Sequence, residues 1–163
     1  MKLVRSLLLA LLATVLPAGA AHAVDLGDRV AWSDVALVDG RVLRAAELKG
    51  RTVVVEFWAT WCPFCATQNP HIQKLHAQHG GKGLVVLTFA LDRDPTAVRR
   101  YMAERGYTFA VALAGPQSES WFGRRRALPE VYVVDAEGRI VFRELGEMFA
   151  EDVAALVRFA AKQ

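Results

Sequence analysis

Residues 52–65 read TVVVEFWATWCPFC and hold both cysteines of the 163-residue chain. The first part, TVVVEFWA, is apolar at nearly every position, which is typical of a central β-strand covered on both faces. The second part places Cys62 directly before Pro63, a residue that favours the first position of a helix. A buried strand that runs into a helix at a cysteine predicts an α/β protein with a reactive group at the junction.

The two cysteines are spaced so that one helical turn brings Cys65 back beside Cys62. At a helix start, Cys62 faces unpaired N–H groups and the positive end of the helix dipole, and both favour a thiolate. We therefore expect Cys62 to be the exposed nucleophile and Cys65 to be the resolving thiol. Pro63 and Phe64, which separate them, carry no ionisable group.

Three other roles compete with redox chemistry for this pair. A purely structural disulfide would close a very small loop and add little stability through chain entropy. A metal site would need further ligands, although two thiolates alone can hold copper(I). Haem attachment would need a histidine after Cys65, where the sequence has Ala66. The spacing by itself does not decide between redox chemistry and copper binding.

The amino terminus has the layout of a secretory signal peptide. Lys2 and Arg5 precede an apolar stretch over residues 7–16, and residues 21–23 (AHA) form a small-x-small cleavage site. The apolar stretch is shorter than the about 20 residues that a membrane-spanning helix needs. We expect cleavage after residue 23, with an uncleaved anchor as the alternative, and a mature protein in the periplasm, where disulfides persist.

Removal of residues 1–23 leaves 140 residues, one ordinary domain over residues 24–163. Without Lys2 and Arg5 the formal charge of +3 falls to about +1, so nothing predicts a nucleic-acid partner. No later segment is apolar enough to span a membrane, and two cysteines are too few for a disulfide scaffold. The arginines at 124–126 predict a solvated surface or the steering of an acidic partner.

The rest of the chain predicts alternating strands and helices. In the first half we expect a hairpin with its turn at Asp39-Gly40, a helical turn ending at Gly50, the strand TVVVEFWA, a helix from Pro63 to about His79 and a strand over 84–91. In the second half we expect a helix opened by Asp94 and Pro95, a short strand over 109–113, a helical turn over 119–122 and a hairpin with its turn at 135–138. A last helix should place Val153, Leu156, Val157 and Ala160 on one face and end at Lys162. This order predicts a central mixed β-sheet flanked by helices, with an N-terminal β-hairpin extension.

Together these features resemble the thioredoxin superfamily, and within it the periplasmic TlpA/ResA/CcmG branch of thiol-disulfide oxidoreductases. The resemblance covers roughly residues 25–159 and implies a thioredoxin-like fold. The segment VDGRVLRAAELKGRTVVVEFWATWCPFC (38–65) is similar to the branch's hairpin, turn, and active-site strand and helix. Pro70 stands where the family kinks its active-site helix. The segment LPEVYVVDAEGRIV (128–141) is similar to the cis-proline loop and the hairpin that follows it.

The resemblance also implies roles for individual residues. Pro129 would be the cis-proline, and the backbone of Leu128 would pair with an extended client segment lying across Cys62. The dipeptide formed by Pro129 and Glu130 is similar to the cytochrome c maturation member of the branch. We expect Trp61 to cover the sulfurs partly. The residues expected to contact a client are Trp61, Pro63, Phe64 and Leu128.

Glu56 lies within the apolar strand, where a charged carboxylate costs several kcal/mol unless it is paired or protonated. A structural ion pair is one interpretation. The resemblance instead places Glu56 at the buried aspartate of classical thioredoxins, which accepts a proton from the resolving cysteine. Many TlpA-type proteins resemble NFW where this chain has EFW (56–58), so they have an uncharged asparagine in place of Glu56. The chain therefore departs from the branch at this position.

These observations predict a protein disulfide oxidoreductase that reduces specific periplasmic protein disulfides by dithiol-disulfide exchange, without a cofactor or a bound metal. The resemblance implies two kinds of partner: periplasmic client proteins, with cytochrome c apoprotein as one possibility, and a membrane thiol-disulfide transporter as electron donor. Oxidising relatives carry histidine between the cysteines, and this chain does not. Two alternatives stay open: a disulfide oxidant or isomerase of the same fold, and a copper-binding assembly factor.

Overall fold

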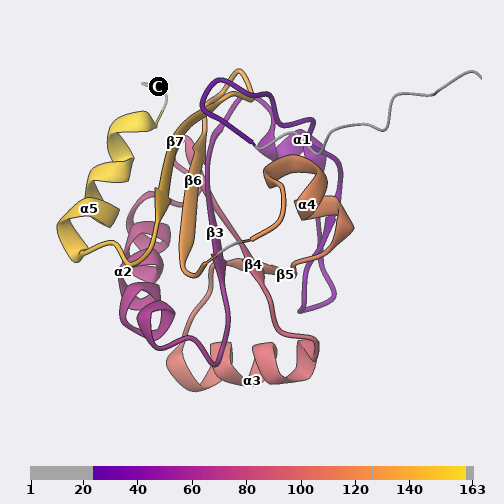
Figure 1. The fold of residues 1–163 in the computed structure, drawn as a ribbon, viewed down its shortest axis with the longest axis vertical. Helices are drawn as coiled ribbons and strands as arrows, with labels where there is room; N and C mark the ends of the chain where they lie inside the picture. The colour runs from indigo at the N-terminus through magenta and orange to yellow at the C-terminus, as the bar shows by residue number, and fades with distance from the viewer. Residues whose placement is uncertain (1–23, 126, 161–163) are drawn as a thin grey trace, which may run out of the picture.

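The computed structural model describes residues 24–125 and 127–160, so the predicted signal peptide lies outside the described residues. A five-stranded sheet in the order β5-β4-β3-β6-β7 forms the centre of the protein (Figure 1). β3, β4 and β5 run parallel, whereas β6 is antiparallel to β3 and β7 is antiparallel to β6. The predicted central mixed sheet is therefore confirmed. Its strands are β3 (Thr52–Trp58), β4 (Leu84–Ala90), β5 (Ala110–Leu113), β6 (Glu130–Val134) and β7 (Ile140–Leu145).

A two-stranded hairpin, β1 (Val35–Ala36) and β2 (Val42–Leu43), precedes the main sheet. Its turn lies at Asp39-Gly40 as predicted, and Gly40 adopts a φ of 88°, which a residue with a Cβ rarely tolerates. The carboxylate of Asp39 accepts a hydrogen bond from the N–H of Arg41 at 3.0 Å. The hairpin leads into a single helical turn, α1 (Ala45–Leu48).

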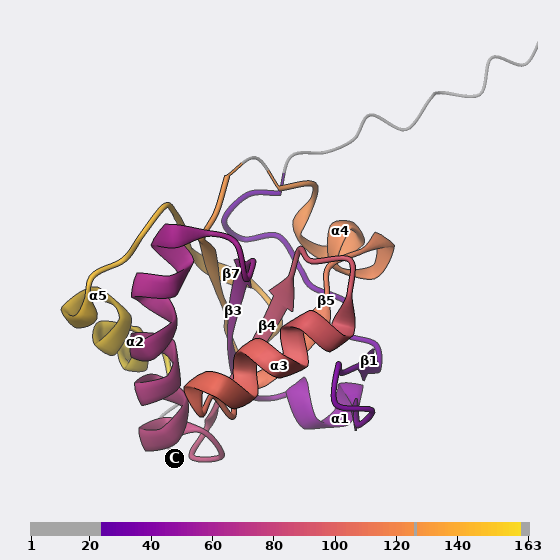
Figure 2. The ribbon, with the colours of Figure 1, turned by 90° about the horizontal axis from the view of Figure 1, so that it is seen from below.

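Helices cover the sheet on both faces, as predicted (Figure 2). On one face lie α2 (Pro63–His79), α3 (Pro95–Arg105) and α5 (Ala150–Ala155), which contribute buried apolar side chains to a common core. On the other face lie the hairpin, α1 and α4 (Pro116–Phe122), which build a second core. No helix within the described residues is long and apolar enough to cross a membrane.

β3 is buried on both faces, as its composition predicts, because every one of its residues is at most 1% exposed. Side chains alternate along a strand. Val54 and Trp58 therefore pack in the core on the α2 face, while Val55 and Phe57 pack in the core on the α4 face. The same alternation directs Glu56 toward α2.

α4 begins earlier than the predicted turn. It starts at Pro116, which occupies the first helical position, where no N–H is required. The hydroxyl of Ser118 accepts a hydrogen bond from the N–H of Gly115 at 3.0 Å and so holds the start of the helix. The last residues of α4, Trp121 and Phe122, pack against the second face of the sheet.

The carboxyl-terminal helix is shorter than predicted. After α5, residues Leu156–Phe159 form a 3-10 turn, η1. Val153 and Leu156 are buried as predicted, but Val157 is 37% exposed and does not share their face. The predicted end at Lys162 lies outside the described residues.

Contacts of Phe159 explain the tighter turn. Its carbonyl accepts a hydrogen bond from the hydroxyl of Thr52 at 2.8 Å, and its ring centroid lies 5.7 Å from that of Phe142. These contacts tie the chain to β3 and β7. A 3-10 turn has about three residues per turn, so the chain rotates Val157 away from the face on which a regular helix would place it.

Candidate redox site

Cys62 lies at the junction between β3 and α2. It is the N-cap residue of α2, with φ −88° and ψ 115°, and its Sγ accepts a hydrogen bond from the N–H of Cys65 at 3.2 Å. Pro63 occupies the first position of the helix. The positive end of the helix dipole therefore faces the Cys62 sulfur and favours its thiolate when the protein is reduced.

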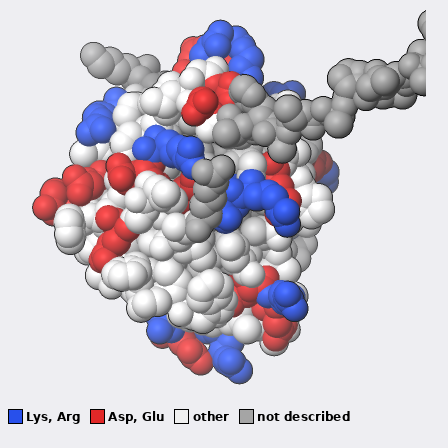
Figure 3. All heavy atoms as spheres, in the orientation of Figure 1, with Lys and Arg blue, Asp and Glu red and all other residues white. Residues whose placement is uncertain are grey.

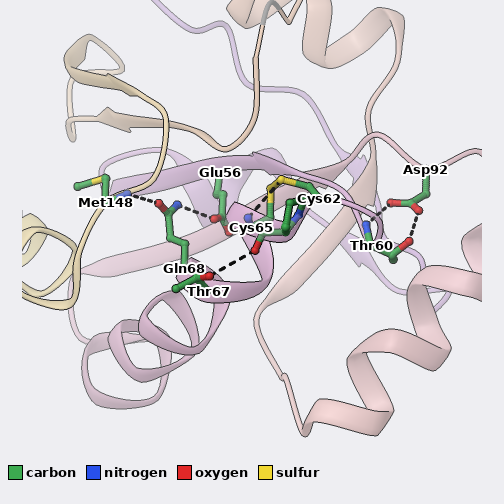
Figure 4. The surroundings of a disulfide bond; sticks show 9 residues. Glu56, Thr60, Cys62, Cys65, Thr67, Gln68, Asp92 and Met148 are labelled. Carbon is green, nitrogen blue, oxygen red and sulfur yellow. Dashed lines mark hydrogen bonds between the residues drawn. A yellow bond between two sulfur atoms is a disulfide. The ribbon is translucent and has the colours of Figure 1, made fainter.

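Cys62 and Cys65 form a disulfide whose Cα atoms lie 5.3 Å apart (Figure 4). That separation is usual for a disulfide. Cys65 is fully buried and Cys62 is 4% exposed. Cys62 is thus less exposed than predicted, because both sulfurs are joined in this oxidised form and both residues pack in the core on the α2 face.

An open hollow of about 390 Å³ lies beside the disulfide and is lined mostly by apolar side chains. At its edge, Trp61 is 68% exposed and Phe64 is 56% exposed. The face drawn in Figure 3 carries a broad area without charged side chains, between acidic groups on the α5 side and basic groups on the α4 side. The apolar lining of the hollow suits apolar side chains of a binding partner. The lining residues are Trp61, Cys62, Pro63, Phe64, Leu91, Arg125, Ala127 and Leu128.

All four residues predicted to contact a client line this hollow. Trp61 stands mostly in solvent at the edge of the hollow. The sequence analysis did not assign Leu91, Arg125 or Ala127 to the site. Leu91 directly follows β4, and the carboxyl ends of neighbouring parallel strands meet at one edge of a sheet. Its place in the sequence could therefore have predicted that it lies near Cys62. The other two lie in the loop between α4 and β6, whose path depends on tertiary contacts.

The peptide bond between Leu128 and Pro129 is cis, as the resemblance implied. Pro129 is buried, and its carbonyl accepts a hydrogen bond from the N–H of Gly146 at 2.9 Å. Leu128 lines the hollow, whereas Pro129 is not part of its lining. The loop before β6 therefore presents Leu128 to the same space as Cys62.

Glu56 lies in the middle of β3, on the same face as the disulfide (Figure 4). Its Oε1 accepts a hydrogen bond from the side-chain amide of Gln68 at 2.7 Å, and the carbonyl of that amide accepts one from the N–H of Met148 at 2.6 Å. Its Oε2 is buried without a hydrogen-bond partner. No ion pair to Glu56 is present among the described residues, so the structural ion pair considered above is not observed.

The burial of Glu56 changes its acidity. Loss of water raises the pKa of this carboxyl from an ordinary 4.5 to about 8, and the hydrogen bond from Gln68 opposes part of that rise. The carboxyl is therefore mostly protonated at neutral pH, which explains how it is buried without a cation. A group that exchanges a proton near neutral pH beside a disulfide can take part in thiol chemistry.

A second polar contact holds the turn that precedes Cys62. The carboxylate of Asp92 accepts hydrogen bonds from the N–H of Thr60 at 3.0 Å and from its hydroxyl at 2.5 Å (Figure 4). Asp92 follows β4 and Thr60 follows β3, so the contact joins the ends of two neighbouring parallel strands. The sequence analysis did not assign either residue.

The arginine run after α4 is divided between solvent and core. Arg124 is 88% exposed, as a solvated surface predicts. The side chain of Arg125 is only 8% exposed and pairs with Glu130, so the interpretation as a solvated run is wrong for this residue. The charge of Arg125 is paired with Glu130 inside the protein because the loop that carries Arg125 folds back onto the sheet. Arg126 lies outside the described residues.

Within residues 24–125 and 127–160, no three or more histidine, cysteine, aspartate or glutamate side chains are grouped so that they could hold a metal ion. The two sulfurs that would bind copper(I) are joined to each other in this form. The arrangement as it stands provides a disulfide at a helix start, an apolar hollow beside it, and a buried carboxyl behind it.

Comparison with known proteins places this geometry among redox proteins. The Redoxin family matches residues 25–157. The thiol-disulfide oxidoreductase ResA of Bacillus anthracis is 26% identical over 121 residues, which cover 74% of this chain and 70% of that protein. ResA of Bacillus subtilis is 24% identical over 110 residues, which cover 68% of this chain and 62% of that protein.

Solved structures agree with the fold. A thiol:disulfide interchange protein of the thioredoxin family from Chlorobium tepidum matches with a TM-score of 0.74 and 25% identity, over 85% of this chain and 99% of that chain. StoA from Bacillus subtilis matches with a TM-score of 0.65 and 20% identity, over 75% of this chain and 92% of that chain. The thioredoxin-like fold and the resemblance seen in residues 38–65 and 128–141 are confirmed.

We expect the Glu56→Gln variant to remove a pH dependence of stability that the oxidised wild-type protein has. The Glu56 pKa is about 8 in the folded protein against 4.5 ordinarily, so between these pH values the folded state holds a proton that the unfolded state has released. The contribution of Glu56 to the free energy of unfolding is therefore full below pH 4.5 and is lost as the pH rises through about 8. A pKa difference of this size corresponds to roughly 3–5 kcal/mol.

Urea unfolding of both proteins across this pH range measures the effect. The free energy of unfolding should fall with rising pH for the wild type and stay flatter for Glu56→Gln. Glu144→Gln, at an exposed position on β7, is the matched control and should keep the wild-type slope. Parallel curves for wild type and Glu56→Gln would contradict the prediction.

Proposed function

This chain belongs to the Redoxin family, and we propose that it is a thiol-disulfide oxidoreductase that reduces particular protein disulfides in the periplasm. One observation carries the proposal: the chain's two cysteines form a disulfide at the start of α2, and Cys62 lines an apolar hollow. The similarity to thiol-disulfide oxidoreductases named ResA supports the same reaction.

The reaction proceeds by two thiol-disulfide exchanges. In the reduced protein, the Cys62 thiolate attacks one sulfur of the client disulfide, and a mixed disulfide forms while the other client sulfur leaves as a thiolate. Cys65 then attacks the Cys62 sulfur, releases the second client thiolate, and closes the disulfide. Two electrons pass from the protein dithiol to the client disulfide. A membrane thiol-disulfide transporter returns the oxidised protein to the dithiol form.

The hollow supplies the contacts for a client segment. Its lining is mostly apolar, so the residues that flank the client cysteine bury apolar surface against Trp61, Phe64 and Leu128. An extended client segment pairs with the backbone at Leu128, in the manner of a strand added to a β-structure. Pro63, between the two cysteines, adds apolar surface at the same place.

Glu56 acts as the proton acceptor for Cys65 in the second exchange. The resolving thiol is buried and must lose a proton before it attacks Cys62. Glu56 lies behind the disulfide with one oxygen free of hydrogen bonds, and its pKa of about 8 is close to that of a thiol. A proton can therefore pass between them with little driving force against it.

Residues 1–23 direct the protein to the periplasm and are removed on export. The mature domain then meets an oxidising compartment in which client disulfides form. Amino-terminal sequencing of the exported protein tests this, because an uncleaved anchor would leave Met1 or Lys2 in the mature chain.

We expect the Cys65→Ala variant to trap client proteins. Without the resolving thiol, the mixed disulfide at Cys62 persists and survives non-reducing electrophoresis. The measurement is recovery of disulfide-linked partners from cells that express the variant. A Cys62→Ala, Cys65→Ala double variant is the control and should recover no disulfide-linked partner. If the Cys65→Ala variant also recovers none, the proposed reaction is wrong.

The reduction potential decides between a reductant and an oxidant of the same fold. We expect equilibrium titration in redox buffers to give a value near that of thioredoxin, about −270 mV, rather than near the strongest periplasmic oxidants, about −120 mV. Every 30 mV corresponds to roughly 1.4 kcal/mol, so the two ranges are well separated. A potential in the oxidant range would reverse the proposed direction of electron flow.

We expect Glu56→Gln to slow release of the client from the mixed disulfide by about 100-fold below pH 8. Glu56 must be deprotonated to accept a proton, so the wild-type rate should rise as the pH approaches the pKa of about 8. The variant should lose that inflection and follow the thiol alone. Stopped-flow measurement of the second exchange against pH gives both curves, and identical profiles would rule out the role of Glu56.

A further inference from the structure

Arg125 lies in the loop between α4 and β6, next to the mostly exposed Arg124. The side chain of Arg124 is 88% exposed, whereas that of Arg125 is 8% exposed. Arg125 also lines the hollow beside Cys62. A guanidinium group held inside the protein at this place requires internal hydrogen-bond partners, and those partners define what it does.

The guanidinium of Arg125 joins the two ends of its own loop. On the side that leaves α4, Nη2 donates to the carbonyls of Phe122 and Gly123, the latter at 2.6 Å. On the side that enters β6, Nη1 donates to Glu130 Oε2 at 2.6 Å and to the hydroxyl of Tyr132 at 3.0 Å. The planar fork of arginine suits such divided bonding, which the single ammonium group of lysine cannot reproduce.

The same side chain is fixed against the active-site strand. Its guanidinium carbon lies 4.0 Å from the ring centroid of Phe57, a fully buried residue of β3. Phe57 and Glu130 are opposite each other in the pairing of β3 with β6. The side chain of Arg125 therefore packs on the central strand of the sheet, and the same residue lines the hollow.

Glu130, which accepts a hydrogen bond from Arg125, is itself held by other side chains. It is 1% exposed, and its Oε1 accepts hydrogen bonds from the hydroxyl of Tyr132 at 2.7 Å and from Arg143 Nε at 2.9 Å, in addition to the bond from Arg125 to Oε2. Both oxygens are thus satisfied. Loss of Arg125 leaves Glu130 Oε2 without this hydrogen bond and removes the anchor of the loop, while Tyr132 and Arg143 still donate to Oε1.

We propose that Arg125 is a positioning residue for client recognition: its fork holds the loop so that Ala127 and Leu128 form the wall of the hollow beside Cys62. The inference rests on the proposed function. Nη1 and Nη2 of Arg125 are occupied by protein acceptors, and its Nε is buried. Arg125 therefore acts through the loop, and a substrate that needs no backbone pairing depends on it much less.

Two disulfide probes separate an effect on recognition of the client backbone from an effect on the thiol chemistry itself. A short cyclic peptide closed by a Cys-Ala-Ala-Cys disulfide offers a backbone to the loop, whereas hydroxyethyl disulfide has none. The reduced wild-type protein, Arg125→Lys, Arg125→Ala and the control Arg124→Ala are each reacted with both probes. We expect the ratio of the peptide rate constant to the hydroxyethyl disulfide rate constant to fall about tenfold in both Arg125 variants, with the loss in KM for the peptide, and to stay at the wild-type value in Arg124→Ala.

The outcomes distinguish the two proposals. A wild-type protein that reduces neither probe overturns the proposed function. A wild-type protein that reduces both, with Arg125 variants whose ratio is unchanged, overturns the role of Arg125 alone. An equal fall in Arg124→Ala assigns the effect to surface charge, and failure of both Arg125 variants to fold assigns Arg125 a purely structural role; either result also overturns the inference.

Discussion

The burial of β3 between two strands and two layers of side chains is the constraint on which the position of the site depends. Every residue of β3 is at most 1% exposed, and the strand is paired with β4 on one side and β6 on the other. A slip of this strand by one residue would exchange the side chains that pack in the two cores, so its register is strongly specified. The turn that follows it, held by the contact between Thr60 and Asp92, therefore delivers Cys62 to one place at the start of α2.

Two buried carboxyl groups flank this strand on opposite faces and differ in their partners. Glu56 has an amide partner and, in the described part of the chain, no cation, so loss of water raises its pKa to about 8 and it exchanges a proton near neutral pH. Glu130 accepts hydrogen bonds from two guanidinium groups, those of Arg125 and Arg143, which offset the cost of burying its charge. One face of the sheet thus holds a carboxyl that suits proton transfer, and the other holds one that suits fixing a loop.

The parts of the fold and site that could be predicted from the sequence are those set by local pattern. A doubly apolar strand, a cysteine before a helix-starting proline, and an Asp-Gly turn each depend on a few neighbouring residues, and the structure has β3, α2 and the first hairpin where these signals place them. The pairing of Arg125 with Glu130 and the 3-10 turn at Leu156–Phe159 depend on contacts between segments far apart in the fold. A run of arginines has the same sequence whether it faces water or folds back onto a sheet, so burial of one member could not be read from composition.

The proposed direction of electron flow depends on how strongly the surroundings of Cys62 stabilise the reduced form. A strong oxidant owes its potential to groups that stabilise the reduced form. Within the described residues, the hydrogen bond to the Cys62 sulfur comes from the N–H of Cys65, and Pro63 has no N–H to add. Among the described residues that line the hollow, the cationic one is Arg125, and its charge is paired with Glu130. Beyond the start of α2 itself, few groups among the described residues stabilise a Cys62 thiolate, and this supports the proposal that the dithiol form reduces a client disulfide.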